Sequence, residues 1–551
     1  MRKLTVSLGV LAAAAALLGC QGKPERPACP PGKRCLEMGN GSEPITLDPH
    51  KSTGTWEDHI LSDVDMGLTQ DAADGTTIPG MAERWETSPD GLVWTFHLRD
   101  AKWSDGQPVT ADDFVYSLRR ILDPKLASEY AYLLYFIKNA APVNAGAKGA
   151  TLDTLGVRAL DARTLQITLE HPAPYLPELA KHTTMFPVPR HVVEKWGDAW
   201  SQPEHFVGNG AYKIVSWRLG DRVHVVKNPL FYDAQNVCFD EINYYPTTDA
   251  ISAERRVMRG ELDINNDFQS NRIDFLRRTA PRYVHTHTYL GVAYLAFNAH
   301  YAPFKDKRVR QALDMAVDRD FITQKLLRGG QQSAYTFVPS GVANYAQAQA
   351  PDWAAWPLAR RQATARALLQ QAGYGPNHPL TVEIKHRNSP DPMLIMPAIQ
   401  ADWASIGVRV TLAQQETQIA YQSYRARDFQ VADAAWVADF NDAMSFLGLQ
   451  KSDTGAQNYG DYANPAYDAL LNAADQEPDL AKRADEMRRA ETIMLQDAPL
   501  VPIFFYINKN LVNPRISGWV DNINDHHRSR FLCEKNFTPA TRSGGNTPSR
   551  P

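Results

Sequence analysis

The segment 380–412 constrains the fold most strongly, because two kinds of hydrophobic periodicity alternate within it. The stretches LTVEIKH (380–386) and VRVTL (408–412) have strand patterns, and the residues from Leu394 to Ile406 have the spacing of a helix. A strand, a helix and a second strand in this order predict a β-α-β unit with parallel strands. We therefore expect an α/β protein with some parallel sheet.

Other stretches repeat these signals. LVWTFHLR (92–99) alternates as a half-buried strand does, and Thr110 is expected to cap a helix that follows it. Two alternating runs within residues 211–228 flank a Leu-Gly-Asp turn and predict a β-hairpin. Residues 306–329 have helical faces, and a charged amphipathic helix over 481–496 leads into the apolar strand VPIFFYI (501–507).

The N-terminus has the features of an export signal. Arg2 and Lys3 precede an uncharged run to Leu18, which is too short to span a bilayer comfortably. Cys20 follows Leu-Leu-Gly as in the lipobox of bacterial lipoproteins, so residues 1–19 are expected to be removed and Cys20 to carry lipid. An ordinary secretory signal that happens to contain a cysteine is the alternative.

Charge and cysteine content narrow the class of protein. The formal net charge is −4 and no basic block occurs, which argues against a nucleic-acid partner. A mature chain of 551 − 19 = 532 residues is expected to form two or three domains. The four remaining cysteines allow three disulfide pairings. A local clasp between Cys29 and Cys35 is the simplest, and it leaves Cys238 to pair with Cys533.

An apolar stretch over 429–447 contains the carboxylate of Asp439. Burying a carboxylate costs several kcal/mol unless a cation and hydrogen bonds meet it. Two interpretations are open. Asp439 forms a structural ion pair with an Arg or Lys, or caps a helix near Asn441; alternatively, a ligand supplies the cation.

No recognisable catalytic motif accompanies these features. The sequence lacks G-x-S-x-G, H-E-x-x-H, Walker A and dinucleotide fingerprints. The spacing of the pairs His285/His287 and His526/His527 is too weak a signal to predict a metal site. We therefore expect a protein that is not an enzyme, with a secreted peptidase as the alternative.

Several stretches together resemble the large extracytoplasmic solute-binding proteins of bacterial peptide ABC importers, most closely the oligopeptide-binding members. In chain order they are GSEPITLDP (41–49), DGLVWTFHLRDAKWSDGQPVTADDFVYSLRR (90–120), VGNGAYKIVSW (207–217), APFKDKRVRQALDMAVDRD (302–320) and AAWVADFNDAMSFL (434–447). The specificity of the resemblance lies in the ordered set, which spans nearly the whole mature chain.

The resemblance implies a two-lobed periplasmic-binding-protein-like fold of type II (cluster C), with an extra inserted domain and a ligand cleft between the lobes. The implied parts are a signal peptide (1–19), a tether (20–35), lobe I (36–65, 190–290 and 508–537), an inserted domain II (66–189), lobe III (291–507) and a disordered tail (538–551). Pairing of Cys238 with Cys533 would then join two segments of lobe I.

The function implied is that of a lipid-anchored, monomeric receptor in the periplasm or cell envelope. It would capture short peptides in a closing cleft and deliver them to the permease subunits of an inner-membrane ABC importer, with no cofactor, no metal and no chemistry of its own. A diverged member that binds a murein peptide, a nickel chelate or a sugar is the alternative within this class.

The resemblance also assigns ligand contacts. The aspartate of the family's W-x-A-D motif binds the peptide α-ammonium, a role that falls on Asp439. The backbone of Ala435 and Val437, and of Asn266 to Gln269 across the cleft, would pair with an extended peptide. The implied aromatic positions of the cleft are Tyr132, Tyr294, Trp436 and Tyr506, and Thr53 and Thr417 are implied at side-chain pockets.

Two departures from the family pattern concern this site. A disulfide common in the family is absent, since its positions fall at Val437 and Gly291. Where oligopeptide binders carry cations for the peptide C-terminus, the alignment gives Leu327, Pro392, Tyr424 and Asp433, and a shifted alignment would use Arg328, Arg387, Arg425 or Arg427 instead. Asp433 either favours a basic ligand side chain or is solvated or paired with an arginine.

Overall fold

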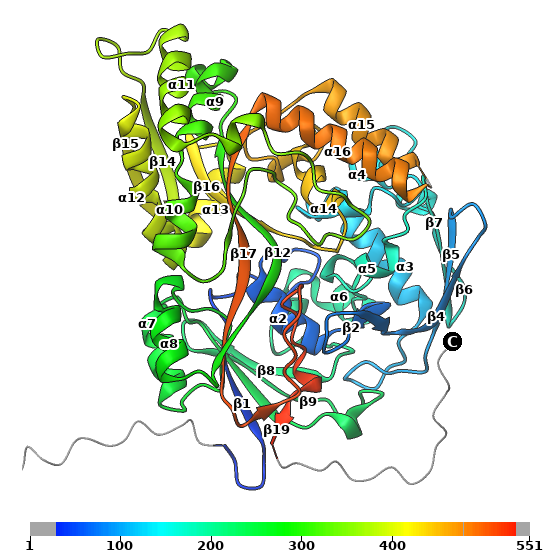
Figure 1. Ribbon diagram of the computed structural model, residues 1–551. Coiled ribbons are helices and arrows are strands. Elements are labelled where there is room, and N and C mark those ends of the chain that lie inside the picture. The colour runs from blue at the N-terminus through cyan, green and yellow to red at the C-terminus, as the bar shows by residue number, and fades with distance from the viewer. Residues whose placement is uncertain (1–28, 478, 536–551) are drawn as a thin grey trace, which may run out of the picture.

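The computed structural model describes residues 29–477 and 479–535, which form a two-lobed α/β fold (Figure 1). One mixed sheet of eleven strands runs through both lobes. From one edge to the other its strands are β15 (Arg409–Gln415), β14 (Thr381–Arg387), β16 (Val431–Val437), β12 (Val284–Phe297), β17 (Leu500–Val512), β11 (Ile264–Asn265), β1 (Cys35–Gly39), β10 (Glu241–Tyr245), β9 (Arg222–Lys227) and β8 (Tyr212–Arg218), and β13 (Gln332–Ser333) pairs with β17.

The β-α-β unit expected from the sequence is confirmed. Strands β14 and β15 pair in parallel from Thr381↔Arg409 to Arg387↔Gln415, and helix α12 (Pro390–Ser405) connects them. Its buried face, which includes Ile399 and Trp403, packs against the same apolar cluster as the inward residues of β14. The order of periodicities in the sequence therefore positions this edge of lobe III.

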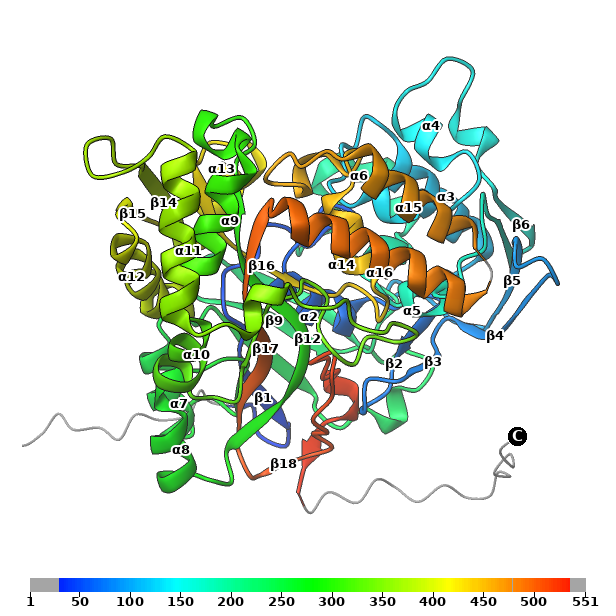
Figure 2. The same ribbon diagram turned by 45° about the horizontal axis from the view of Figure 1, so that its top comes forward.

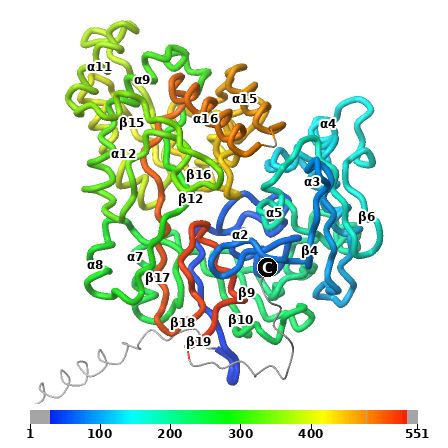
Figure 3. The backbone as a smooth tube through the Cα atoms, turned by 45° about the vertical axis from the view of Figure 1, so that its right-hand side comes forward, coloured from blue at the N-terminus to red at the C-terminus, as the bar shows by residue number. Residues whose placement is uncertain are grey.

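Two long strands, β12 and β17, connect the halves of the sheet. They pair antiparallel, and the register shifts between Thr288 and Val292. Figure 3 shows β17 running from the upper part of the molecule to the lower part. An irregularity of this kind bends a strand. The lobe boundary expected at 290/291 falls in this irregular region and the one expected at 507/508 falls at its edge, and we propose them as the points at which the chain crosses between lobes.

The region 66–189 has a small sheet of its own. Its strands, in order, are β4 (Ala82–Thr87), β5 (Val93–Leu98), β7 (Thr164–Thr168) and β6 (Val157–Asp161), and β2 (Thr69–Asp71) pairs separately with β3 (Thr77–Pro79). Strand β5 buries Trp94, Phe96 and Leu98, the alternate residues that the sequence predicts. Thr110 caps helix α3 (Ala111–Leu122), as expected, through a capping box with Asp113.

The inserted region shares its apolar core with lobe I. Buried residues of the insertion, such as Phe96 and Phe114, belong to the same cluster as Leu36 and Val225 of the lobe I strands. A second cluster lies under helices α15 (Pro465–Gln476) and α16 (Leu480–Asp497). These two helices lie between the other helices of lobe III and the inserted region (Figure 2).

The remaining helices are short or medium in length. They are α2 (Thr55–Val64), α4 (Ala140–Asn144), α5 (Leu176–Leu179), α6 (Arg190–Trp196), α7 (Ala250–Met258), α8 (Ile273–Thr279), α9 (Lys307–Ala316), α10 (Arg319–Phe321), α11 (Leu358–Gln371), α13 (Thr417–Arg425) and α14 (Met444–Leu447). The helical stretch expected over 306–329 is interrupted after α9, because Asp318 caps a new helix that continues as a π-helix over Ile322–Leu327. Within the described residues, no helix combines the length and apolarity needed to cross a membrane.

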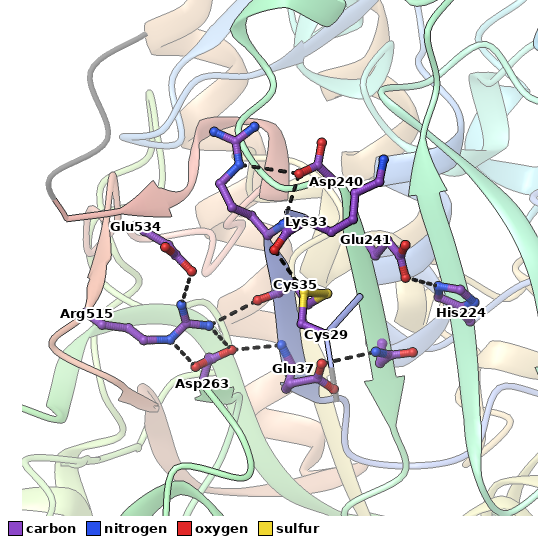
Figure 4. The surroundings of a disulfide bond; sticks show 12 residues. Cys29, Lys33, Cys35, Glu37, His224, Asp240, Glu241, Asp263, Arg515 and Glu534 are labelled. Carbon is purple, nitrogen blue, oxygen red and sulfur yellow. Dashed lines mark hydrogen bonds and ion pairs between the residues drawn. A yellow bond between two sulfur atoms is a disulfide. The ribbon is translucent and has the colours of Figure 1, made fainter. Parts of the chain in front are cut away.

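The C-terminal segment returns to lobe I. Strands β18 (Ile516–Ser517) and β19 (Cys533–Glu534) pair with each other. Disulfides join Cys29 to Cys35 and Cys238 to Cys533, so the second bond links two segments of lobe I. Figure 4 shows the neighbouring polar contacts, in which Arg515 bonds to both Asp263 and Glu534. The expected signal peptide over 1–19, the expected lipidation site Cys20 and the tail over 538–551 lie outside the described residues.

Candidate ligand-binding site

A cavity of about 410 Å³ lies between the lobes. Its wall includes the loop before α2, residues of the inserted region near Tyr130 and His182, and the end of β16. All three parts of the fold therefore face one enclosed space, whose volume lies within the range of small-molecule sites.

Asp439 lies in this wall, just beyond the end of β16, and its side chain is 9% exposed. Among the described residues, the nearest group that could carry a positive charge is the imidazole of His182, at 3.6 Å. The carboxylate oxygen Oδ2 has no hydrogen-bond partner within the described chain. Asp439 is thus a buried carboxylate in the cavity wall that no Arg or Lys of residues 29–477 and 479–535 pairs with.

Electrostatics at this position oppose ionisation of the empty site. Burial raises the pKa of Asp439 to about 8, and a hydrogen bond from Tyr130 only partly offsets the rise. Burial also lowers the pKa of His182 to about 4, so this imidazole is neutral near pH 7 and supplies no charge. A cation that enters the cavity would restore the ionised carboxylate.

The two structural roles considered for Asp439 are performed by Asp442 instead. Asp442 forms the buried ion pair, with Arg483 at 2.7 Å, and its Oδ1 accepts a hydrogen bond from the backbone N–H of Met444 at the start of α14. Asp439 takes part only through its own backbone N–H, which donates to Ser445. The expectation of an Arg or Lys partner or of a helix cap is therefore wrong for Asp439.

The end of β16 offers a free backbone edge to the cavity. On one side β16 pairs with β12, and the bond from Ala438 N–H to the Leu290 carbonyl shows that the even-numbered residues of β16 bond in that direction. On the other side β14 pairs only with Val431 and Ala432. The N–H and C=O groups of Ala435 and Val437 therefore point to an edge that no described strand covers.

Most of the other residues predicted for the site line the cavity. These are Trp436, Asn266, Tyr506, Thr417 and Thr53, together with Ala435 and Val437. Two predicted residues do not. Tyr294 is 1% exposed and packs edge-on against Phe337 in the core, and Tyr132 lies beside Tyr130 without reaching the wall.

The structure also distinguishes among the arginines that could bind a ligand carboxylate. Arg387 and Arg425 line the cavity, whereas Arg328 pairs with Asp274 and Arg427 with Asp461. At the aligned positions, Leu327 and Tyr424 are buried, and Pro392 lines the wall.

Asp433 is buried and pairs with Arg387 at 2.9 Å, which is the arginine-paired interpretation. The idea that Asp433 selects a basic ligand side chain is therefore wrong. Gly291 lies opposite Val437 in the strand register, which is the arrangement that a disulfide at these two positions would need.

Several wall residues carried no recognisable signal in the sequence. Tyr130 and His182 reach Asp439 from the inserted region, and Asp391 and Lys509 form an ion pair at 3.0 Å within the cavity wall. These residues belong to segments far apart in the chain, so no local spacing marks them. Only the stretch that contains Asp439 has a recognisable family motif.

The histidine pairs considered for metal have other contacts. His285 contacts Asp521 at 3.1 Å, and His526 contacts Asp71 at 2.9 Å. In residues 29–477 and 479–535, no group of three His, Cys, Asp or Glu side chains gathers as a metal site would.

Two lobes that share crossing strands and enclose a cavity define a class of proteins that bind a ligand by closing over it. A family model described as bacterial extracellular solute-binding proteins, family 5 middle, matches residues 76–458. The chain belongs to this family.

Relatives of the chain are binding proteins by name. The periplasmic oligopeptide-binding protein OppA of Salmonella typhimurium is 38% identical over 501 residues, covering 89% of this chain and 91% of OppA. The probable deoxycholate-binding periplasmic protein YgiS of Escherichia coli is 37% identical over 508 residues, covering 91% of this chain and 94% of YgiS.

Solved structures bear on the fold and on its conformation. The murein tripeptide binding protein MppA of Escherichia coli superposes with a TM-score of 0.88 at 35% identity, covering 91% of this chain and 99% of MppA. A second MppA structure, described as an unliganded open form, gives a TM-score of 0.67 at the same identity, covering 91% of this chain and 98% of that one. The lobes of this protein are therefore arranged differently from those of the open form.

Proposed function

We propose that this protein is a receptor that captures short peptides between its lobes and delivers them to an ABC-type membrane importer. The observation that carries the proposal is Asp439, a buried carboxylate in the cavity wall that lacks a cationic partner among the described residues. The α-ammonium of a peptide is a cation of the right charge to restore its ionised form. Relatives named for oligopeptide and murein tripeptide binding support the same ligand class.

Backbone geometry favours a peptide over other cations. The uncovered edge at Ala435 and Val437 offers donors and acceptors at the spacing of a β-strand, and an extended peptide can pair with them. Asn266 lines the same cavity from lobe I and would supply the other side of such a clamp. An amine without a peptide backbone would use only Asp439.

Contacts between the lobes support capture by closure. The ring of Tyr175, in the inserted region, stacks on Phe440 of lobe III with centroids 5.0 Å apart. Arg425 of lobe III contacts Glu129 of the inserted region at 2.8 Å. We propose that the irregular pairing of β12 and β17 is the hinge, and that a bound peptide stabilises the closed arrangement.

Other ligand classes fit this wall less well. A bile acid such as deoxycholate carries a carboxylate, which a cavity closing over Asp439 would disfavour. A sugar carries no cation for Asp439, and a nickel chelate has no peptide backbone to pair with the edge at Ala435 and Val437. A murein peptide shares the chemistry of short peptides and is included in the proposal.

The cellular context is also a proposal. The names of the relatives support the periplasm. We propose that Cys20 carries the lipid that holds the protein at a membrane of the cell envelope, and that the protein acts as a monomer toward its importer.

Incubation with a mixed peptide pool, followed by native mass spectrometry, tests the proposal. A receptor returns intact peptides in stoichiometric complex with the protein. A peptidase returns fragments. Retention of no peptide, with bile acids or sugars bound instead, would contradict the ligand class.

A further inference from the structure

A second group of charges lies in the cavity wall, formed by Asp391, Asp267 and Lys509. The Lys509 ammonium contacts Asp391 Oδ2 at 3.0 Å and Asp267 Oδ1 at 3.2 Å. It also donates to the hydroxyl of Ser270 at 2.8 Å. Lys509 is on β17, whereas Asp391 is in the first turn of α12, so the group spans the two lobes.

This group has more negative charge than positive charge. Two carboxylates share one ammonium, and the three N–H donors of Lys509 are matched by its three contacts. Asp391 is 6% exposed, and its second oxygen, Oδ1, has no hydrogen-bond partner within residues 29–477 and 479–535. A buried carboxylate oxygen left in this state is costly.

Another acid of the wall differs from Asp391 in this respect. Asp58 accepts hydrogen bonds on both oxygens, from Arg528 at 3.0 Å and from Ser62 at 2.9 Å. Asp391 therefore resembles Asp439, because each lines the same cavity and has one buried carboxylate oxygen without a hydrogen-bond partner within the described residues. Two such acids in one cavity wall suit a ligand with two cationic groups.

We propose that Asp391, with Asp267 beside it, binds a basic side chain of a peptide whose α-ammonium is at Asp439. The inference rests on the proposed function and adds a preference for peptides that contain Lys or Arg. Lys509 does not exclude a second cation, because the two carboxylates leave one negative charge uncompensated. The ligand cation would meet this pair of carboxylates where they line the cavity.

Calorimetric titration with a set of tetrapeptides tests this inference. Each peptide is tetraalanine with one Lys at position 2, 3 or 4, and its control has norleucine, which lacks the charge, at the same position. Hydrogen bonds to charged groups predict that Lys at one position binds about 10- to 100-fold more tightly than norleucine. A ratio near one at every position, with the peptides still bound, would overturn the inference and leave the proposed function intact.

Two variants locate the effect. In Asp391→Asn the ratio of Lys to norleucine affinity should fall toward one, and Lys509 keeps Asp267 as a partner. Asp274→Asn is the matched control, because Asp274 also forms an ion pair between the lobes, with Arg328, but lies outside the cavity wall. That variant should keep the wild-type ratio. Equal loss in both variants would assign the effect to closure, and failure of every peptide to bind would refute the proposed function together with the inference.

Discussion

Closing the empty cavity over Asp439 should be costly near neutral pH. Burial raises the pKa of Asp439 from 3.8 to about 8, whereas the open cleft leaves the carboxylate hydrated. Between these two pKa values the closed empty state binds a proton that the open state lacks, so closure becomes less favourable as pH rises through this window. Near pH 7 the cost is on the order of 4 kcal/mol.

A peptide α-ammonium removes this cost by meeting the ionised carboxylate. Since about 1.4 kcal/mol is a factor of ten, wild-type protein should bind tetraalanine roughly 10²- to 10³-fold more tightly than N-acetyl-tetraalanine. Asp439→Asn keeps the size of the side chain and removes its charge. This variant should lose most of the discrimination between the two peptides.

Calorimetric titration of both peptides into both proteins measures the four affinities. The unfolding temperature of ligand-free Asp439→Asn should differ little from that of the wild type, because the open cleft hydrates the carboxylate. Equal affinities of the wild type for free and acetylated peptide would refute the role of Asp439. A large stability loss in the ligand-free variant, together with indifference to acetylation, would show a structural role instead.

Further predictions concern pH, the peptide backbone, the anchor and the missing disulfide. Affinity for a peptide with a free amine should be greatest between about pH 4 and 8. Below this range binding must remove a proton from Asp439, and above it binding must add a proton to the amine. An affinity that does not change with pH would contradict this prediction. N-methylation of one peptide N–H that faces β16 should weaken binding by about 3- to 10-fold in titration, unlike methylation of an outward N–H. Cys20→Ser should move the protein from the membrane fraction to the soluble fraction, since lipid chains supply the attachment; an unchanged distribution would contradict the anchor. Gly291→Cys with Val437→Cys should form a disulfide detectable by thiol titration, because the two positions face each other in the register.

Local patterns predicted the elements that local forces determine. The alternation of β5 and the capping box at Thr110 depend on neighbours within a few residues, and both were predictable. The same reasoning failed where tertiary packing decides. Tyr294 and its neighbours on β12 are buried on both faces of the sheet, so alternation could not show which of them faces the cavity.

The candidate site was predictable only in part for the same reason. Asp439 stands out because a charge interrupts an apolar run, which is a local contrast. Asp391 and Lys509 become neighbours only when the fold brings the first turn of α12 to β17. Nothing in the spacing of these two residues, which are separated by more than a hundred positions, indicates that contact.

The central place of β17 in the large sheet has a consequence for folding during export. Strand β17 lies between β12 and β11, and it supplies the pairing that joins the β14–β16 half to the β1–β10 half. A chain that crosses a membrane from its N-terminus delivers residues 500–512 among the last. Lobe I therefore lacks the strand that joins its half-sheet to the other half until translocation is nearly complete, while most of lobe III has already emerged. A truncation before residue 500 should accordingly leave two separate half-sheets with exposed edges, which are targets for envelope proteases and for aggregation.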